Sequence, residues 1–202
     1  MGDDAAFPGG EAEIRVYRPG ECAPFRRLTD ALGALSNMAP GFPLVVNGLT
    51  IGSSEALYQC MRFPHLPDVQ RLVIAAPSPL AAKEACAPRR EQSRADWTEV
   101  RVEVMRWCLR VKLAQHRGVL GSVLVCSGEL PIVEVSARDV FWGAKPREDG
   151  AFVGANVLGR LWTAVRGEHC AGDGIGAAPP PGIQGCLLLR ERIGTVPAPS
   201  LR

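Results

Sequence analysis

Two carboxylates in different local settings are the first candidates for chemistry in this sequence. Glu55 follows the pair Ser53-Ser54 at the expected start of a helix, where backbone amides and the helix dipole favour a negative charge. Asp139 follows an expected strand, where a loop side chain can point into a cleft. Two such acids could share acid–base work. Each also has an ordinary structural interpretation, helix-end electrostatics for Glu55 and a local turn hydrogen bond for Asp139.

Two tryptophans and a lysine could bind a ligand beside such carboxylates. Trp142 precedes Gly143 and offers a flat surface to a base-like ring, although a core position is the usual outcome for tryptophan. Trp97 stands near the start of a long amphipathic helix, whose periodicity favours the core for it. Lys83 could meet a phosphate or a carboxylate, and a solvated lysine is the commoner case.

The elements that must position these residues are mostly helical. Asn47-Gly48 between two apolar runs predicts a hairpin over residues 44–51. Serine caps, prolines and apolar periodicity predict helices over residues 53–63, 67–74, from 78 onward, 93–116 and 153–166, and β-branched content predicts strands near residues 14–17 and 130–135. We therefore expect a mainly α fold, a compact helical domain with a small β-hairpin or sheet element.

The two ends of the chain differ in composition from the middle. Residues 1–12 read as an N-terminal tail, and residues 169–202 as a Gly/Pro-rich C-terminal tail. Within the second tail, residues 186–193 could form one short helix or strand. The predicted domain therefore covers residues 13–168.

Charge and hydropathy exclude several classes of protein. The 23 basic and 21 acidic residues leave a formal charge of +2, too little for general nucleic-acid binding, so any such contact must be local. No apolar run approaches the roughly 20 residues that span a bilayer. The acidic start of the chain does not resemble a signal peptide. We expect a cytoplasmic protein without a membrane partner.

Cysteine, histidine and glycine patterns predict neither a metal nor a cofactor. The seven cysteines are scattered without a CxxC pair, and the three histidines lie far apart in the sequence. The glycines form neither GxGxxG nor a P-loop. We expect most of the cysteines to be reduced core thiols, and we expect no metal site and no cofactor.

A set of short motifs in a fixed order resembles one known family. The motifs are Leu35-Ser36-Asn37, Asn47-Gly48, SEALYQ at 54–59, Ala82-Lys83, Asp96-Trp97, Met105, Lys112, IVEVS at 132–136, Asp139 with Trp142-Gly143, and GANVLG at 154–159. Together they resemble the NADAR family, also called YbiA-like, over about residues 14–166. The resemblance implies a mainly helical fold and hydrolysis of N-glycosidic bonds. In some members the substrate is ADP-ribose on guanine in DNA, and in others a ribosylamino-pyrimidine phosphate of riboflavin synthesis.

The same resemblance assigns roles to particular residues. It implies Glu55 and Asp139 as catalytic residues, and as substrate-binding residues Asn37, Tyr58, Lys83, Trp97, Trp142 and Asn156. Two departures are visible. The family often has His where this chain has Ala56, and Lys-Phe where it has Arg62-Phe63; arginine keeps the charge but cannot form a Schiff base.

The chemistry of N-glycoside cleavage fits these residue types. Breaking a ribose C1′–N bond creates oxocarbenium character at C1′, which calls for a carboxylate and for an acid that protonates the leaving nitrogen. An aromatic ring can grip the base and a cation the phosphate. Together with the resemblance, these residue types predict a metal-free N-glycoside hydrolase of an N-linked ribosyl nucleotide, with guanine-linked ADP-ribose preferred over riboflavin intermediates. The alternative is a non-catalytic ADP-ribose or nucleotide-binding module.

Overall fold

The computed structural model of this chain describes residues 12–172 and 177–196. These residues form two units, each made of segments that are far apart in the sequence. Unit 1 contains the described residues up to Ser36 and those from Gly118 to 172. Unit 2 contains Asn37–Arg117 and residues 177–196.

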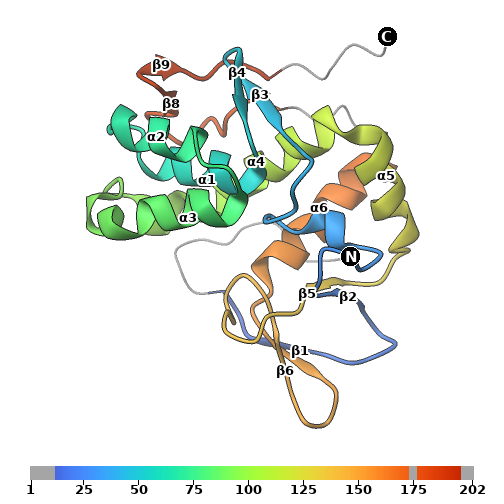
Figure 1. Cartoon of the computed structure of the whole chain (residues 1–202). Coiled ribbons are helices and arrows are strands. Elements are labelled where there is room, and N and C mark those ends of the chain that lie inside the picture. Colours follow the sequence, from blue (N-terminus) through green and yellow to red (C-terminus); the bar gives the residue numbers. More distant parts are fainter. Residues whose placement is uncertain (1–11, 173–176, 197–202) are drawn as a thin grey trace. The chain divides into compact units, whose positions relative to one another are not determined.

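Four helices form most of unit 2 (Figure 1). They are α1 (Ser54–Arg62), α2 (Pro67–Ile74), α3 (Pro79–Cys86) and α4 (Trp97–Gln115), with a short 3-10 helix, η2 (Ala87–Gln92), between α3 and α4. Ser53 caps α1 by accepting a hydrogen bond from Ala56 N, and Ser78 caps α3 through Ala81 N. Helix α1 packs against the other three helices, so it forms the centre of this unit.

The predicted hairpin is confirmed. Strands β3 (Leu44–Val46) and β4 (Leu49–Ile51) pair antiparallel, with Leu44 opposite Ile51. Asn47 and Gly48 both have positive φ, 50° and 74°, as a two-residue turn between twisted strands requires.

Part of the predicted C-terminal tail is folded. Strands β8 (Leu187–Leu188) and β9 (Glu191–Arg192) form a second hairpin, and β8 packs on α1. The fully buried Gln70 holds this hairpin: its Nε2 donates to the carbonyls of Cys60 and Leu187, and its Oε1 accepts from Leu189 N. The Gly/Pro-rich composition predicted a tail here. The hairpin forms because the buried Gln70 side chain pairs with backbone groups of Leu187 and Leu189.

Unit 1 combines small sheets with two helices. Strands β1 (Arg15–Tyr17), β7 (Phe152–Gly154) and β6 (Lys145–Pro146) form an antiparallel sheet, and β2 (Ala23–Phe25) pairs parallel with β5 (Ile132–Glu134). The other elements are η1 (Gly33–Leu35), α5 (Arg117–Cys126, almost wholly in this unit) and α6 (Val157–Cys170). Helix α6 packs so closely on β5 that a Cβ at Gly159 would lie 2.1 Å from the Ile132 carbonyl oxygen.

The fold class is confirmed as mainly α with small sheet elements, but some helix boundaries were wrong. The helix predicted over residues 153–166 begins at Val157 and runs to Cys170, because residues 152–154 form a strand and Asn156 has a φ of 49°, outside the helical region. The helix predicted from Ser93 begins at Trp97. None of the helices in the described ranges is long and apolar enough to cross a membrane.

Candidate active site

Glu55 lies in the first turn of α1 and is almost fully buried, with 6% of its surface exposed. The backbone carbonyl of Asn37 accepts hydrogen bonds from Glu55 N and Ser54 Oγ, both at 3.3 Å. The helix start and the Asn37 segment are therefore fixed to each other.

Two neutral amides hold the Glu55 carboxylate. Asn37 Nδ2 donates to Oε2 at 2.6 Å, and Gln59 Nε2 donates to Oε1 at 2.8 Å. Each carboxylate oxygen has its own donor, so rotation of the group would break a hydrogen bond. This arrangement suits a preorganised negative charge.

The same face of α1 carries aromatic and cationic groups. Tyr58, one turn after Glu55, lies against Trp97 with ring centroids 4.8 Å apart, and the Arg62 guanidinium lies 5.6 Å from the Trp97 ring centroid. Arg62 Nε also donates to Ser93 Oγ at 2.6 Å. Burial, followed by the charge of Glu55, raises the pKa of Tyr58 above its usual range, so Tyr58 stays a neutral phenol. Burial is also the main reason why the pKa of Arg62 is lowered.

The structure thus brings together Asn37, Glu55, Tyr58 and Trp97 in unit 2, but Lys83 has a different environment. Lys83 lies on α3 with an exposed side chain, and no hydrogen bond joins it to the Glu55 cluster within the described ranges. The exposed side chain fits the ordinary interpretation of a solvated lysine, and the substrate-binding role of Lys83 stays a prediction.

The remaining predicted site residues belong to unit 1. Asp139 Oδ1 accepts hydrogen bonds from the backbone N–H groups of Phe141 (2.9 Å) and Trp142 (2.8 Å), which is a local turn. Trp142 is half-buried, with its ring 5.1 Å from that of Phe141. Asp139 and Trp142 therefore lie on one turn.

Asn156 is buried and holds strand β5. Its Oδ1 accepts from Glu134 N at 3.0 Å, and its Nδ2 donates to the Ile132 carbonyl at 2.8 Å. Both ends of the amide are used within unit 1, so its visible contribution is structural.

Sequence reasoning missed Gln59 as part of the site and noted Arg62 only as a departure from the family. Both follow Glu55 at helical spacing, four and seven residues later, so they lie on the same face of α1. That spacing was the signal that could have found them.

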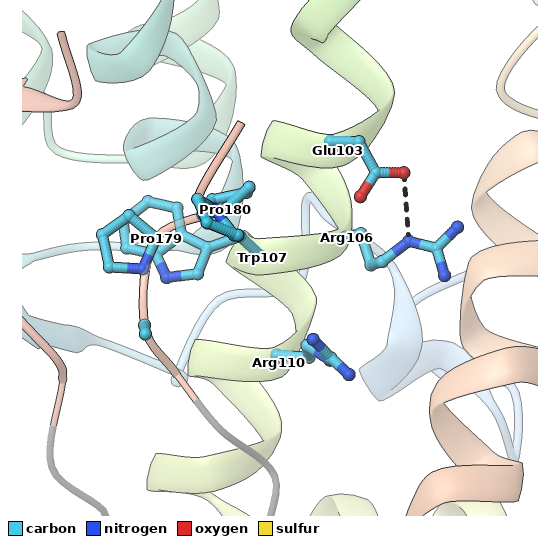
Figure 2. A pocket seen from close by; sticks show the side chains of 8 residues that line it. Glu103, Arg106, Trp107, Arg110, Pro179 and Pro180 are labelled. Atoms are coloured by element: carbon cyan, nitrogen blue, oxygen red, sulfur yellow. Dashed lines mark ion pairs between the residues drawn. The ribbon is translucent and has the colours of Figure 1, made fainter. Parts of the chain in front are cut away.

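Unit 2 also contains a hollow of about 280 Å³ that includes none of the predicted site residues. Figure 2 shows its lining, which comes from α4 and from a proline-rich segment: Glu103, Arg106, Trp107, Arg110, Ala178, Pro179, Pro180 and Pro181. Arg106 Nε forms an ion pair with Glu103 at 3.4 Å, and Trp107 Nε1 donates to the Ala177 carbonyl. The proline segment is thereby attached to α4.

The described residues thus form a mainly helical fold with small sheets, and this fold contains a buried carboxylate held by two side-chain amides. The chain belongs to the NADAR domain family, whose model matches residues 25–168. This confirms the resemblance inferred from the sequence motifs.

Relatives agree with this assignment. The chain is 30% identical to the N-glycosidase YbiA of Escherichia coli over 145 residues, 70% of this chain and 84% of that protein. It is 34% identical to the riboflavin biosynthesis protein VVA0006 of Vibrio vulnificus over 136 residues, 67% of this chain but only 35% of that protein. The NMR structure of E. coli YbiA is similar, with a TM-score of 0.64 and 26% identity over 75% of this chain and 87% of that one.

Proposed function

We propose that this chain is an N-glycoside hydrolase that cleaves the ribose C1′–N bond of an N-linked ribosyl nucleotide, with guanine-linked ADP-ribose as the substrate. The coarser part of the proposal, an enzyme that hydrolyses N-glycosyl compounds, is supported by the family and by relatives named N-glycosidases. The observation that carries it is the Glu55 carboxylate, buried and held by Asn37 and Gln59.

Glu55 has the properties that this reaction needs. As the C1′–N bond breaks, positive charge develops on the ribose, and a fixed carboxylate stabilises that charge without reorganising. The hydrogen bonds from Asn37 and Gln59 keep the oxygens in place during this step. The same carboxylate can instead orient the attacking water.

The other proposed residues bind the substrate and transfer a proton. Trp97, packed on Tyr58 and beside the Arg62 guanidinium, offers an aromatic surface for the base. We assign the protonation of the leaving nitrogen to Asp139. Its turn uses Oδ1 for both hydrogen bonds, so Oδ2 is the oxygen proposed for this step.

A second substrate has its own support. The Vibrio vulnificus relative is named a riboflavin biosynthesis protein, as is a chloroplast relative from Arabidopsis thaliana. A ribosylamino-pyrimidine phosphate contains the same kind of C1′–N bond, so the proposed chemistry would serve it as well. A nucleotide-binding module without turnover is the third possibility.

One experiment ranks these functions. The purified protein is incubated with an oligonucleotide carrying ADP-ribosylated guanine and, separately, with the ribosylamino-pyrimidine phosphate, and the released sugar is measured by mass spectrometry. Release from the first substrate supports the proposal, and release from the second alone favours the riboflavin-type activity. Binding without release by wild type, and unchanged in a Glu55→Gln/Asp139→Asn double variant, would identify a binding module.

A further inference from the structure

The two amides that hold Glu55 have a paired nitrogen and an unpaired oxygen. Asn37 and Gln59 are each 5% exposed, and each donates one N–H to the carboxylate. Their oxygens, Asn37 Oδ1 and Gln59 Oε1, are buried and have no hydrogen-bond partner among the residues that the structure describes. A buried carbonyl without a donor is costly, with a penalty comparable to a lost hydrogen bond.

The other buried amides of residues 12–172 and 177–196, Gln70 and Asn156, do not show this deficit. Gln70 Oε1 accepts from Leu189 N, and Asn156 Oδ1 accepts from Glu134 N. Where an amide only supports the fold, its oxygen is therefore paired with the backbone. The deficit at Asn37 and Gln59 occurs beside the one carboxylate that the mechanism uses in unit 2, which indicates a partner that arrives with the ligand.

We propose that Gln59 Oε1 and Asn37 Oδ1 form a hydroxyl-binding subsite that accepts hydrogen bonds from the ribosyl group of the substrate. The proposal rests on the function proposed above, in which Glu55 faces C1′. The two carboxylate oxygens and the two amide oxygens together present acceptors, which repel a phosphate and favour a group rich in donors. With C1′ at Glu55, the neighbouring sugar hydroxyls are the nearest donors of the substrate.

Gln59 then has two separable functions. Its Nε2 positions the Glu55 carboxylate, which affects kcat, and its Oε1 binds a hydroxyl, which affects affinity. Gln59→Leu removes both functions. Gln59→Glu keeps acceptor oxygens but replaces the donor with a charge that repels Glu55, so we expect kcat to fall while the preference for the hydroxylated sugar remains.

The test measures binding of ribose 5-phosphate and 2-deoxyribose 5-phosphate by calorimetry. We expect wild type to prefer ribose 5-phosphate by about fivefold, the ratio given by one neutral hydrogen bond. We expect Gln59→Leu to bind the two sugars equally. Gln70→Leu, which removes a buried but fully paired glutamine, is the matched control: it should lower the melting temperature and leave the fivefold preference unchanged. Gln59→Met replaces Gln59→Leu if the latter does not fold.

Amino groups of a base share the donor chemistry of sugar hydroxyls, so a second pair of ligands separates the two sources. Guanine and hypoxanthine differ in the exocyclic amino group. A preference for guanine that Gln59→Leu abolishes, with no preference between the sugars, would overturn the hydroxyl assignment. An unchanged sugar preference in Gln59→Leu would overturn it as well. Turnover by wild type keeps the proposed function in either case, whereas absence of both turnover and sugar binding removes the function and the subsite together.

Discussion

Glu55 in unit 2 and Asp139 in unit 1 are both carboxylates that accept two hydrogen bonds, but the donors differ in kind. The donors to Glu55 are side-chain amides, one of them 18 residues away in the sequence. The donors to Asp139 are backbone N–H groups two and three residues further along the same turn. The first arrangement requires the burial of two polar side chains, and these two hydrogen bonds satisfy no backbone group. The second is sufficient to explain Asp139 as a turn residue.

Asn156 extends this contrast. In unit 1 its amide pairs with two backbone groups of β5, whereas in unit 2 the amides of Asn37 and Gln59 pair with a side chain and leave their oxygens unpaired. Polar groups that maintain a fold are satisfied within it. The unpaired amide oxygens beside Glu55 therefore support the proposed site, and substitutions in the two units can test this interpretation.

The largest expected effect is that of Glu55→Gln. The amide preserves size, and Asn37 or Gln59 can turn its own amide to match the new group, so the fold should survive. Loss of the fixed negative charge should lower kcat roughly 100-fold or more. Steady-state kinetics and a thermal melt measure the two properties; wild-type kinetics in a folded variant would remove Glu55 from the mechanism.

Asp139→Asn tests the other side of the comparison. Asparagine keeps an oxygen that can accept from Phe141 N and Trp142 N, so the turn and the melting temperature should change little. If Asp139 protonates the leaving group, kcat should fall about 100-fold. Unchanged kcat would assign Asp139 to the turn alone and leave Glu55 as the single carboxylate of the mechanism.

The features that sequence predicted well are those whose cause is local. Asn47-Gly48 sets its own turn, and Ser53 and Ser78 cap the helices that follow them within three residues. Glu55 and Tyr58 could be placed on one helix for the same reason. The order of the short motifs along the chain predicted the family. Single residue types and their local spacing were not sufficient for that prediction.

The features that sequence could not give depend on distant partners. The hairpin β8–β9 is held by Gln70, more than a hundred residues earlier, and no local pattern marks that pairing. The start of α6 depends on Asn156, which leaves the helical region to bind β5. The hydrogen bond from Asn37 to Glu55 likewise joins residues 18 positions apart, and no local pattern marks that contact.

Asn156→Ala should reduce stability rather than catalysis. The substitution leaves Glu134 N and the Ile132 carbonyl without their partner and places alanine at a φ of 49°, at a cost of about 2 kcal/mol. Denaturant unfolding measures the change. Asn47→Ala is the control, because its φ is 50° and its exposed side chain donates a hydrogen bond to the Arg192 carbonyl at 3.1 Å. Equal losses in the two variants would show that the buried hydrogen bonds of Asn156 contribute no more than this exposed one.

Trp97→Phe tests whether Trp97, which packs on Tyr58 near Glu55, binds the base or only fills the core. Trp97 is 8% exposed and packs on Tyr58, so truncation to alanine should lower the free energy of unfolding by about 3 to 5 kcal/mol. A loss of binding in that variant could then not be separated from a loss of folded protein. Phenylalanine keeps a ring against Tyr58 but reduces the surface for a base, so affinity should fall by about 1 kcal/mol, roughly fivefold. Ligand titration of the folded variant checks this; a lower melting temperature with unchanged affinity would place Trp97 in the core alone.

The smallest effect concerns Lys112, a fully buried lysine of unit 2. Its Nζ lies 4.7 Å from the Phe42 ring centroid, and burial lowers its pKa to about 7. Between that value and the ordinary lysine pKa of about 10.4, the unfolded chain binds a proton that the folded chain does not. Stability should therefore rise with pH from about 7 upward, by less than about 1 kcal/mol over the first pH unit. Lys112→Met should remove this slope in denaturant unfolding at pH 7 and pH 8, and a slope that persists in the variant would assign the pH dependence to other groups.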